Sequence, residues 1–497
     1  MVNVGDFSVA VALPHELFSD LWTQHPNVAR KRFSGEPGEL LSFWDAAMVN
    51  NEPWFENHPL KSVAIGEPLK CIPIRLWGDD APIAKRGRQC RAFSWTSAVV
   101  RLESLHCKMC AYCIDPQVVD FGMETELLKA IVWSINVMGM GTHPAYDHTG
   151  RPWAPASPRA RLSGQPLSPE GHIGIYVETG GDWPFLCQIF GLRQSAWHEM
   201  VCHRCYACKT AGPNNYSNAA PDAPWVTTRR TTLTYLEDVV ASPPPLTHLL
   251  GFELGTIADD LLHDDLLGVR LSLCGSTLRM LCDLGVWGLP EGLAWKPRLD
   301  AQLAEAYRAF RQFTTKYGIH HSQPKFKHTS LSMHTLTEWP VLKAKAFNCA
   351  MVSLFLFDTA KRSMTGDPCS QMLASTLFGF AAIWCLCSSA GQFFTKAQRV
   401  SLEEYRKAAL MGYNWLSSHC MQRGVFMFDM RPKFHKVDES LRHACLCGRN
   451  PAWSWTFGDE DWIGTMANLS ESCHKSTMHK RAMQRWLTHF LPNCRMT

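Results

Sequence analysis

The sequence carries little net charge for its size. Its 497 residues include 49 lysines and arginines and 45 aspartates and glutamates, which leaves a formal net charge of +4 at pH 7. Such a balance neither requires nor excludes a nucleic-acid partner, so local clusters of charge must decide. The chain also lacks internal repeats and low-complexity tracts, and 46% of it is hydrophobic. This composition excludes a disordered protein and predicts a globular chain with a large core.

The N-terminal stretch MVNVGDFSVAVALPHELF lacks the features of a signal peptide. It has no basic start, and no clean apolar run leads to a small-residue cleavage site. We therefore expect no secretion. The 20 cysteines are then expected to be thiols or metal ligands before disulfides.

Charge is absent from residues 372–391, MLASTLFGFAAIWCLCSSAG. This run is long enough to span a bilayer, which makes membrane insertion one interpretation. Its serines and threonine, and the preceding apolar run AFNCAMVSLFLFD, favour the other interpretation, a pair of buried core helices. We expect no membrane partner.

Two buried strands are expected to end at carboxylates. LKCIPIRLWGDDAPI leads to Asp79 and Asp80, and GHIGIYVETGGDWPFL leads to Asp182. Glu460, in GDEDW, heads the last expected helix. Acids from two strand ends and a helix can converge and hold hard divalent cations, and two Mg²⁺ ions held in this way support phosphoryl transfer. The alternative is that they are solvated turn residues.

Two cysteine runs predict bound metal. The members are Cys202, Cys205 and Cys208 in VCHRCYACKT, and Cys107, Cys110 and Cys113 in HCKMCAYC. Two thiolates of one run, joined by a second pair of ligands, would form a tetrahedral zinc site. An iron–sulfur cluster also uses thiolates, but the four-cysteine ferredoxin spacing is absent, which favours zinc. Uncoordinated thiols are the alternative.

Further charged groups are candidates for binding. Asp260 and His263, in DDLLHDDLLG, are expected one helical turn apart, where they could hold a metal or orient a base, or form a surface pair. Basic clusters in AKRGRQCR, TTRRTT, RPKFHK and the C-terminal helix would suit phosphate contacts. Each basic cluster could equally be a solvated face.

These motifs, in this order, resemble the catalytic region of CACTA-type cut-and-paste transposases, in particular the divergent transposase-like proteins of dinoflagellates. The resemblance rests on IPIRLWGDDAP, GDWPFL, the C-x₂-C element, the D-x-x-H stretch followed by LLGV and GSTL, and NPAWSWTFGDEDWIGTMANL. It covers roughly residues 10 to 490. The chain departs from the family in two ways. It has the additional cysteine triplet at Cys107, and no separate N-terminal DNA-binding domain is visible in its sequence.

The resemblance implies an α/β fold, an RNase H-like mixed sheet with a zinc-binding element and a large helical insertion. The catalytic acids that hold Mg²⁺ or Mn²⁺ would be Asp79, or Asp80 in its place, with Asp182 and Glu460. Asp461 and Glu439 are rivals for the third position. The family's zinc-binding C-x₂-C would fall on Cys202 and Cys205, and its C/D-x-x-H element on Asp260 and His263.

The expected organisation has five segments: an N-terminal helical and irregular segment (1–60), an RNase H-like core (61–200), a cysteine-rich zinc element and loop (201–250), a helical insertion (251–430), and the C-terminal part of the core with a closing helix (431–497). The implied protein cuts and joins DNA, forms a homo-oligomer and works in the nucleus. The alternatives are an inactive or domesticated binding derivative and a zinc-dependent hydrolase that uses His263 and cysteines.

Overall fold

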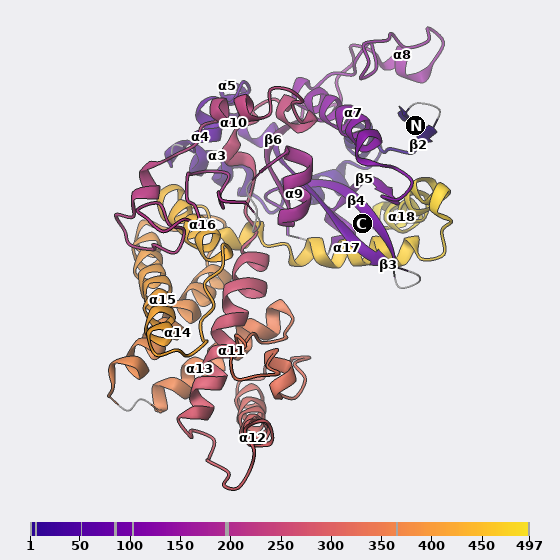
Figure 1. The fold of residues 1–497 in the computed structure, drawn as a ribbon. Helices are drawn as coiled ribbons and strands as arrows, with labels where there is room; N and C mark the ends of the chain where they lie inside the picture. Colours follow the sequence, from indigo (N-terminus) through magenta and orange to yellow (C-terminus); the bar gives the residue numbers. More distant parts are fainter. Residues whose placement is uncertain are drawn as a thin grey trace. The chain divides into compact units, whose positions relative to one another are not determined.

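The computed structural model describes residues 2–4, 7–50, 52–83, 87–101, 104–193, 198–363 and 366–495. The chain forms two compact units (Figure 1). The first unit contains residues 1–192, 231–260 and 453–497, and the second contains residues 193–230 and 261–452. Lys85 and Arg86, in the basic cluster AKRGRQCR, lie outside the described residues.

The first unit is built on a four-stranded mixed sheet. Its strands are β3 (Cys71–Ile83), β4 (Arg88–Ser97), β5 (Met109–Ile114) and β6 (Ile173–Gly181). Their spatial order is β5-β4-β3-β6, with β3 antiparallel to β4, β4 antiparallel to β5, and β3 parallel to β6. The predicted α/β class with a mixed sheet is therefore confirmed.

The two predicted strands are present, with one correction. β6 ends immediately before Asp182, as expected. β3, however, runs through Asp79 and Asp80 and ends at Ile83, because these residues continue the antiparallel pairing with β4. The cysteine run at Cys107 also contains a strand, β5, in which all six residues are buried.

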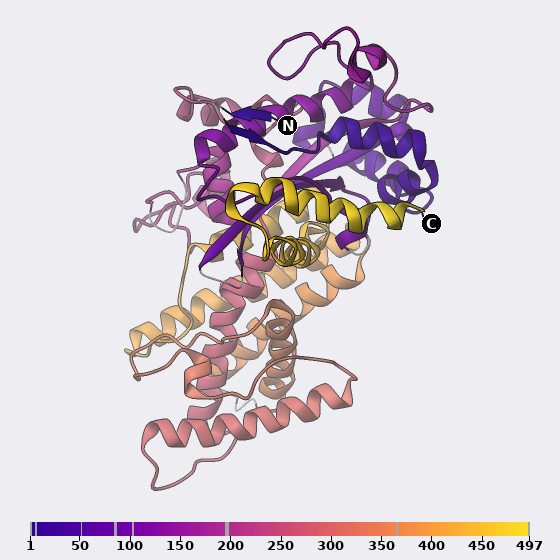
Figure 2. The ribbon, with the colours of Figure 1, turned by 90° about the vertical axis from the view of Figure 1, so that its right-hand side faces the viewer.

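Helices cover both faces of this sheet. α7 (Phe121–Met140) connects β5 to β6 and packs on β6, and α9 (Trp183–Phe190) follows β6 directly. α17 (Phe457–Ser470) packs on β3 and β4, and α18 (Met478–Arg495) packs on β5 (Figure 2). A Cβ atom added at Gly78 would clash with the Phe185 ring of α9, which shows that α9 lies on the face of the sheet to which residue 78 points. The single closing helix that the sequence predicts is two helices, separated by the short turn at Lys475–Thr477.

The remaining elements of this unit are short. They are β1 (Val2–Val4), β2 (Phe7–Val9), α1 (Pro14–Gln24), α2 (Pro26–Ala29), α3 (Glu39–Val49), α4 (Pro53–Glu56), α5 (Lys61–Gly66), α6 (Ser104–Cys107), α8 (Pro158–Leu162) and α10 (Thr232–Asp238).

The second unit is helical, as predicted for the middle of the chain. Its helices are α11 (Arg270–Asp283), α12 (Trp295–Lys316), α13 (Ala346–Arg362), α14 (Pro368–Ser389), α15 (Lys396–Gln422) and α16 (Lys433–Cys447). The helix expected from Gly255 onward begins only at Leu261, with a π-helical stretch over Leu262–Val269.

α14 contains the charge-free run. Among the described helices it is the one that is long and apolar enough to cross a membrane, with 22 residues and a mean hydropathy of 1.6. It packs against α13 and α15, and 56% of its apolar window is buried within the structure. Gly379 of α14 and Gly412 of α15 allow these two helices to approach closely, since a Cβ at Gly379 would lie 2.4 Å from the Ala409 nitrogen. The core helix of a globular protein can be as long and as apolar as a membrane span, and the packing of α14 is that of a core helix.

Candidate functional site

The first two predicted acids lie on neighbouring parallel strands. Gly78 of β3 pairs with Gly181 of β6, so the same register places Asp79 beside Asp182. Asp79 is buried, and Asp182 is half-buried at the end of its strand. The parallel pairing therefore brings the two backbone positions to the same part of the sheet, while the side chain of Asp182 turns to the N-terminus of α9.

Both carboxylates are oriented by backbone amides. The Asp182 side chain accepts a hydrogen bond of 2.8 Å from the Phe185 amide and thereby caps the N-terminus of α9. Oδ1 of Asp79 accepts a bond of 2.7 Å from the amide of Asp80. These bonds orient both carboxylates through the backbone.

Asp80 has a different environment. It points to the opposite face from Asp79, where its carboxylate receives two hydrogen bonds from Arg91, at 2.6 and 2.7 Å. Arg91 also pairs with the buried Glu124, whose second oxygen accepts from Tyr112 at 2.8 Å. Asp80 is thus part of a structural ion-pair network, which leaves Asp79 as the acid of this pair that faces α17.

The third predicted acid lies at the head of α17. α17 packs on the Asp79 face, where the ring centroids of Trp462 and Trp77 are 6.1 Å apart. Glu460 flanks the buried stripe of this helix and is half-buried, whereas Asp461 is exposed. Asp459, which the sequence analysis did not select, is the acid that points at the sheet, with 1% of its surface exposed.

A buried arginine joins these elements. Arg75, two pleats before Asp79 on the same face, lies 3.0 Å from Glu178 of β6 and 3.5 Å from Asp459. Asp459 also pairs with Lys108. Burial alone lowers the pKa of Arg75, but Asp459, Glu178 and Asp260 together raise it above its ordinary value, so this guanidinium stays charged.

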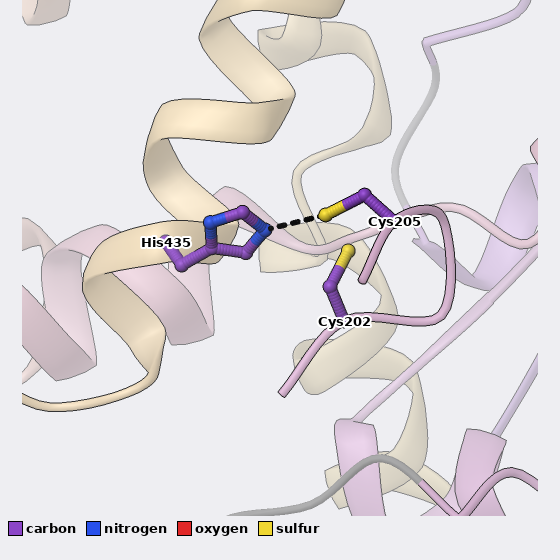
Figure 3. A group of neighbouring side chains, drawn as sticks. All are labelled: Cys202, Cys205 and His435. Carbon is purple, nitrogen blue, oxygen red and sulfur yellow. Dashed lines mark hydrogen bonds between the residues drawn. The ribbon is translucent and has the colours of Figure 1, made fainter. Parts of the chain in front are cut away.

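The cysteine run forms a second site, in the helical unit. Cys202 and Cys205 come from a loop, and His435 comes from α16 (Figure 3). Their sulfur and nitrogen atoms all lie within 4.8 Å of one another, and Nε2 of His435 is 3.3 Å from Sγ of Cys205. All three side chains are buried. This group could hold a metal ion.

Electrostatics prepare one of these thiols for metal binding. Burial raises the pKa of Cys202, but its contacts with Cys205 and His435 outweigh burial and hold that pKa well below its ordinary value. The pKa of His435 is raised, against burial, by the same contact with Cys202. The pKa of Cys205 is raised by its hydrogen bond to Cys202. A thiolate is the form that binds metals, so Cys202 is in a suitable ionisation state, whereas Cys205 and His435 would release their protons when a metal binds.

Glu439 interacts electrostatically with Cys202 and His435, although its carboxylate is not among the ligand atoms that lie within 4.8 Å of one another. It lies one helical turn after His435 on α16, with 3% of its surface exposed. Oε1 pairs with Arg229, while Oε2 is buried without a hydrogen-bond partner. Burial and the nearby Cys202 raise the pKa of this carboxyl. The Glu439 proposed as a rival catalytic acid therefore belongs to the cysteine site.

The loop that carries the cysteines has its own small core. Trp225, Val201 and Ala223 pack around Cys202 and Cys205. The Trp225 ring meets the His435 imidazole edge-on, with centroids 4.3 Å apart. This packing orients the imidazole relative to the two sulfurs.

Cys208 lies outside the three-residue group. Its sulfur is 3.7 Å from the Asn214 carbonyl, and its backbone pairs with Met200 and Asn215. Cys208 is therefore a turn residue that shapes the loop rather than a member of the ligand cluster.

The second cysteine run is a piece of β-sheet. Cys110 contacts the Tyr112 carbonyl and the Met483 sulfur, and Cys113 lies 3.5 Å from the Ser470 hydroxyl. Cys107 is buried in α6. In the part of the chain that the structure describes, these thiols join no group of three close ligand atoms. They fill the interface between the sheet and its C-terminal helices.

Asp260 and His263 do not form the expected helical pair. Asp260 precedes the helix and accepts a hydrogen bond of 2.5 Å from the Thr456 hydroxyl, beside α17. His263 lies in the π-helical stretch, where its carbonyl accepts from Lys433 at 2.7 Å. The helix-spacing argument fails here because the helix starts one residue too late to include the aspartate.

The sequence did not point to His435 or Arg75 as site residues, and it suggested Glu439 as a catalytic acid and not as a neighbour of the cysteines. His435 is 230 residues from Cys205, and no spacing rule connects them. The signal in the sequence was the spacing of His435 and Glu439 in KFHKVDES, one helical turn apart. This stretch resembles an ordinary basic cluster. No protein-family model and no curated protein matches this chain.

Proposed function

We propose that this chain is a DDE/D-type transposase-like protein with an RNase H-like core. The observation that carries the proposal is the register of β3 and β6, whose last pair is Gly78 and Gly181, so that Asp79 and Asp182 follow directly where the parallel pairing ends. The strand order, two antiparallel hairpin connections followed by a helix and a parallel strand, supports the same core. The protein would act on DNA, as a homo-oligomer, in the nucleus.

Glu460 completes the acidic site in this proposal. Asp459 is already neutralised by Arg75 and Lys108, while Glu460 sits half-buried on the flank of the same helix turn. Carboxylates from two strands and a helix suit Mg²⁺ or Mn²⁺, which, when bound, activate a water or a 3′-hydroxyl and stabilise the leaving oxygen. The protein's own part is to fix Asp182 through the α9 cap and Asp79 through its bond to the Asp80 amide.

The cysteine site is proposed to hold structural zinc. Cys202, Cys205, His435 and Glu439 offer two sulfurs, one imidazole nitrogen and one carboxylate oxygen, a set that zinc accepts in tetrahedral geometry. The buried, unpaired Oε2 of Glu439 supports this assignment, because such an atom would otherwise lose its hydration without compensation. Four protein ligands leave no open position, which argues against the zinc-dependent hydrolase.

The test of the acidic site is Asp182→Asn. Asparagine caps a helix as well as aspartate does, so α9 should persist while the charge is lost. We expect metal-dependent nicking of supercoiled plasmid to fall at least about 100-fold, with DNA binding and thermal midpoint unchanged. Nicking at the wild-type rate would contradict the assignment.

Asp120→Asn is the matched control. Asp120 caps α7 in the same unit, accepting from the Met123 amide at the same 2.8 Å, and lies on no strand end. This variant should retain full nicking activity.

An inactive DNA- or protein-binding descendant is the second candidate. It is favoured by the structural work that both acids already perform, since Asp182 caps α9 and Asp79 holds its neighbour's amide. Wild-type protein that binds DNA and retains zinc but shows no metal-dependent nicking would support this candidate.

A further inference from the structure

The end of the chain has a strong excess of positive charge. From Ser472 to the last residue there is no aspartate or glutamate, while Lys475, Lys480, Arg481 and Arg485 lie in the same stretch. The stretch that forms α18 therefore supplies cationic residues and no acidic residue of its own. A solvated face is the ordinary outcome of such a run, so the arrangement of the side chains has to decide.

The structure folds part of this stretch into a groove. The groove has a volume of about 300 Å³ and lies between the turn that precedes α18 and the helix itself, all within the first unit. Its lining residues are Ser472, Cys473, His474, Thr477, Arg481, Gln484, Arg485 and Thr488. None of the described residues that line it is acidic, so an anion that enters meets no opposing charge.

The donors in the groove are available. Arg485 donates hydrogen bonds from Nη1 to the Leu469 carbonyl, at 2.6 Å, and to the Cys473 sulfur. These bonds hold the guanidinium in place and leave its Nε and Nη2 to donate to a ligand. Arg481 is exposed, and its bond to Gln484 is long, at 3.4 Å. A bound phosphate oxygen would compete easily with such a contact.

His474 adds a directed donor. Its Nδ1 lies 2.7 Å from the Ser476 hydroxyl and accepts from the Ser476 amide, so the neutral ring carries its proton on Nε2. The hydroxyls of Thr477 and Thr488 also line the groove. The positive end of the α18 dipole lies at Met478, next to Thr477, and also favours an anion.

We propose that this groove binds the phosphodiester backbone of a nucleic acid. Arg481 and Thr488 are separated by roughly 10 Å along the helix axis. That length corresponds to about three successive phosphates of one strand at 3.4 Å rise each. Basic and hydroxyl side chains together, with no base-reading aromatic among the lining residues, suit backbone contacts and predict no sequence preference.

The groove is independent of the acidic site. Its residues follow α17, whereas Asp79 and Asp182 belong to β3 and the cap of α9. The two proposals therefore fail separately: Asp182→Asn should keep duplex binding, and a groove variant should lose it whether or not the protein cleaves DNA.

The experiment uses the full chain and a fluorescein-labelled 20-bp duplex, titrated at several salt concentrations. Arg481→Gln should weaken binding and reduce the slope of log K against log salt concentration by about 0.9, the value for one lost phosphate contact. Arg481→Lys should keep most of the slope, because the point charge remains. Arg481 is exposed, so the thermal midpoint should not change.

Arg308→Gln is the matched control. Arg308 is equally a helix-surface arginine, on α12, with 66% of its side chain exposed and an ion pair to Glu305. It should leave the salt slope unchanged. Equal slopes for wild type and Arg481→Gln would overturn the proposal. A second result would also overturn it: an Arg481→Gln protein that binds the duplex as well as wild type does but whose duplex binding inorganic pyrophosphate no longer inhibits. The groove would then be a site for a free phosphate.

Discussion

A Cys205→Ser variant is expected to lose the zinc that we propose for the cysteine site and to unfold its helical unit at a markedly lower temperature. Serine keeps the shape of the side chain but cannot provide a thiolate, so the group of Cys202, Cys205 and His435 loses one of its ligands. Zinc contributes about 10–16 kcal/mol to the folding of small zinc domains. A loss of at least about 3 kcal/mol in the free energy of unfolding is therefore expected here. Metal analysis of the purified chain and calorimetry measure both effects.

Cys208→Ser provides the control in the same loop. Cys208 has the same chemistry and lies in the same C-x₂-C pattern, but its sulfur faces the Asn214 carbonyl instead of the ligand cluster. This variant should retain one zinc per chain and the wild-type thermal midpoint. If Cys208→Ser lost the metal and Cys205→Ser kept it, the assignment of the ligands would be wrong.

Arg75→Met is expected to destabilise the sheet unit by about 3–5 kcal/mol at pH 7, because it removes the cation that pairs with the buried Glu178 and leaves Asp459 with Lys108. Glu178 and Asp459 are both almost fully buried, and Arg75 is the residue that joins them. Methionine fills a similar volume, so the effect comes from charge and not from a cavity. Chemical denaturation measures the change.

Arg159→Met is the comparison for this variant. Arg159 also pairs with a carboxylate in the same unit, Glu16, but both side chains are more than a third exposed. Such a pair contributes about 0–1 kcal/mol because water screens it. A loss for Arg75→Met as small as that for Arg159→Met would show that the buried network does not stabilise the sheet.

Local pattern predicted much of the secondary structure. The apolar runs that lead to Asp79 and Asp182 marked β3 and β6, and the charge-free run marked the helix α14. The errors lie where local rules are ambiguous. β3 continues past Asp79 and Asp80 because it pairs with β4, a contact that the strand's own residues do not encode. The helix after Asp260 begins late because that aspartate bonds to Thr456 instead of capping the helix.

The two candidate sites differ in how far the sequence could reach. Asp79 and Asp182 each end a recognisable apolar run, so their positions were visible, although only the parallel register of β3 and β6 puts them side by side. Asp79 and Asp80 are indistinguishable in the sequence. The pleat separates them, turning Asp80 to Arg91 and Asp79 to the face covered by α17.

The sequence by itself determined the alternation of strands and helices, the helical middle of the chain, the C-x₂-C pair and the basic end. Each of these depends on residues that are close in the chain. The tertiary structure alone decided that His435 joins Cys202 and Cys205, that Arg75 pairs with Asp459, and that Cys110 and Cys113 pack in a sheet. These are contacts across long stretches of chain. Composition and spacing carry no information about them, because folding brings the residues together through the burial of other side chains.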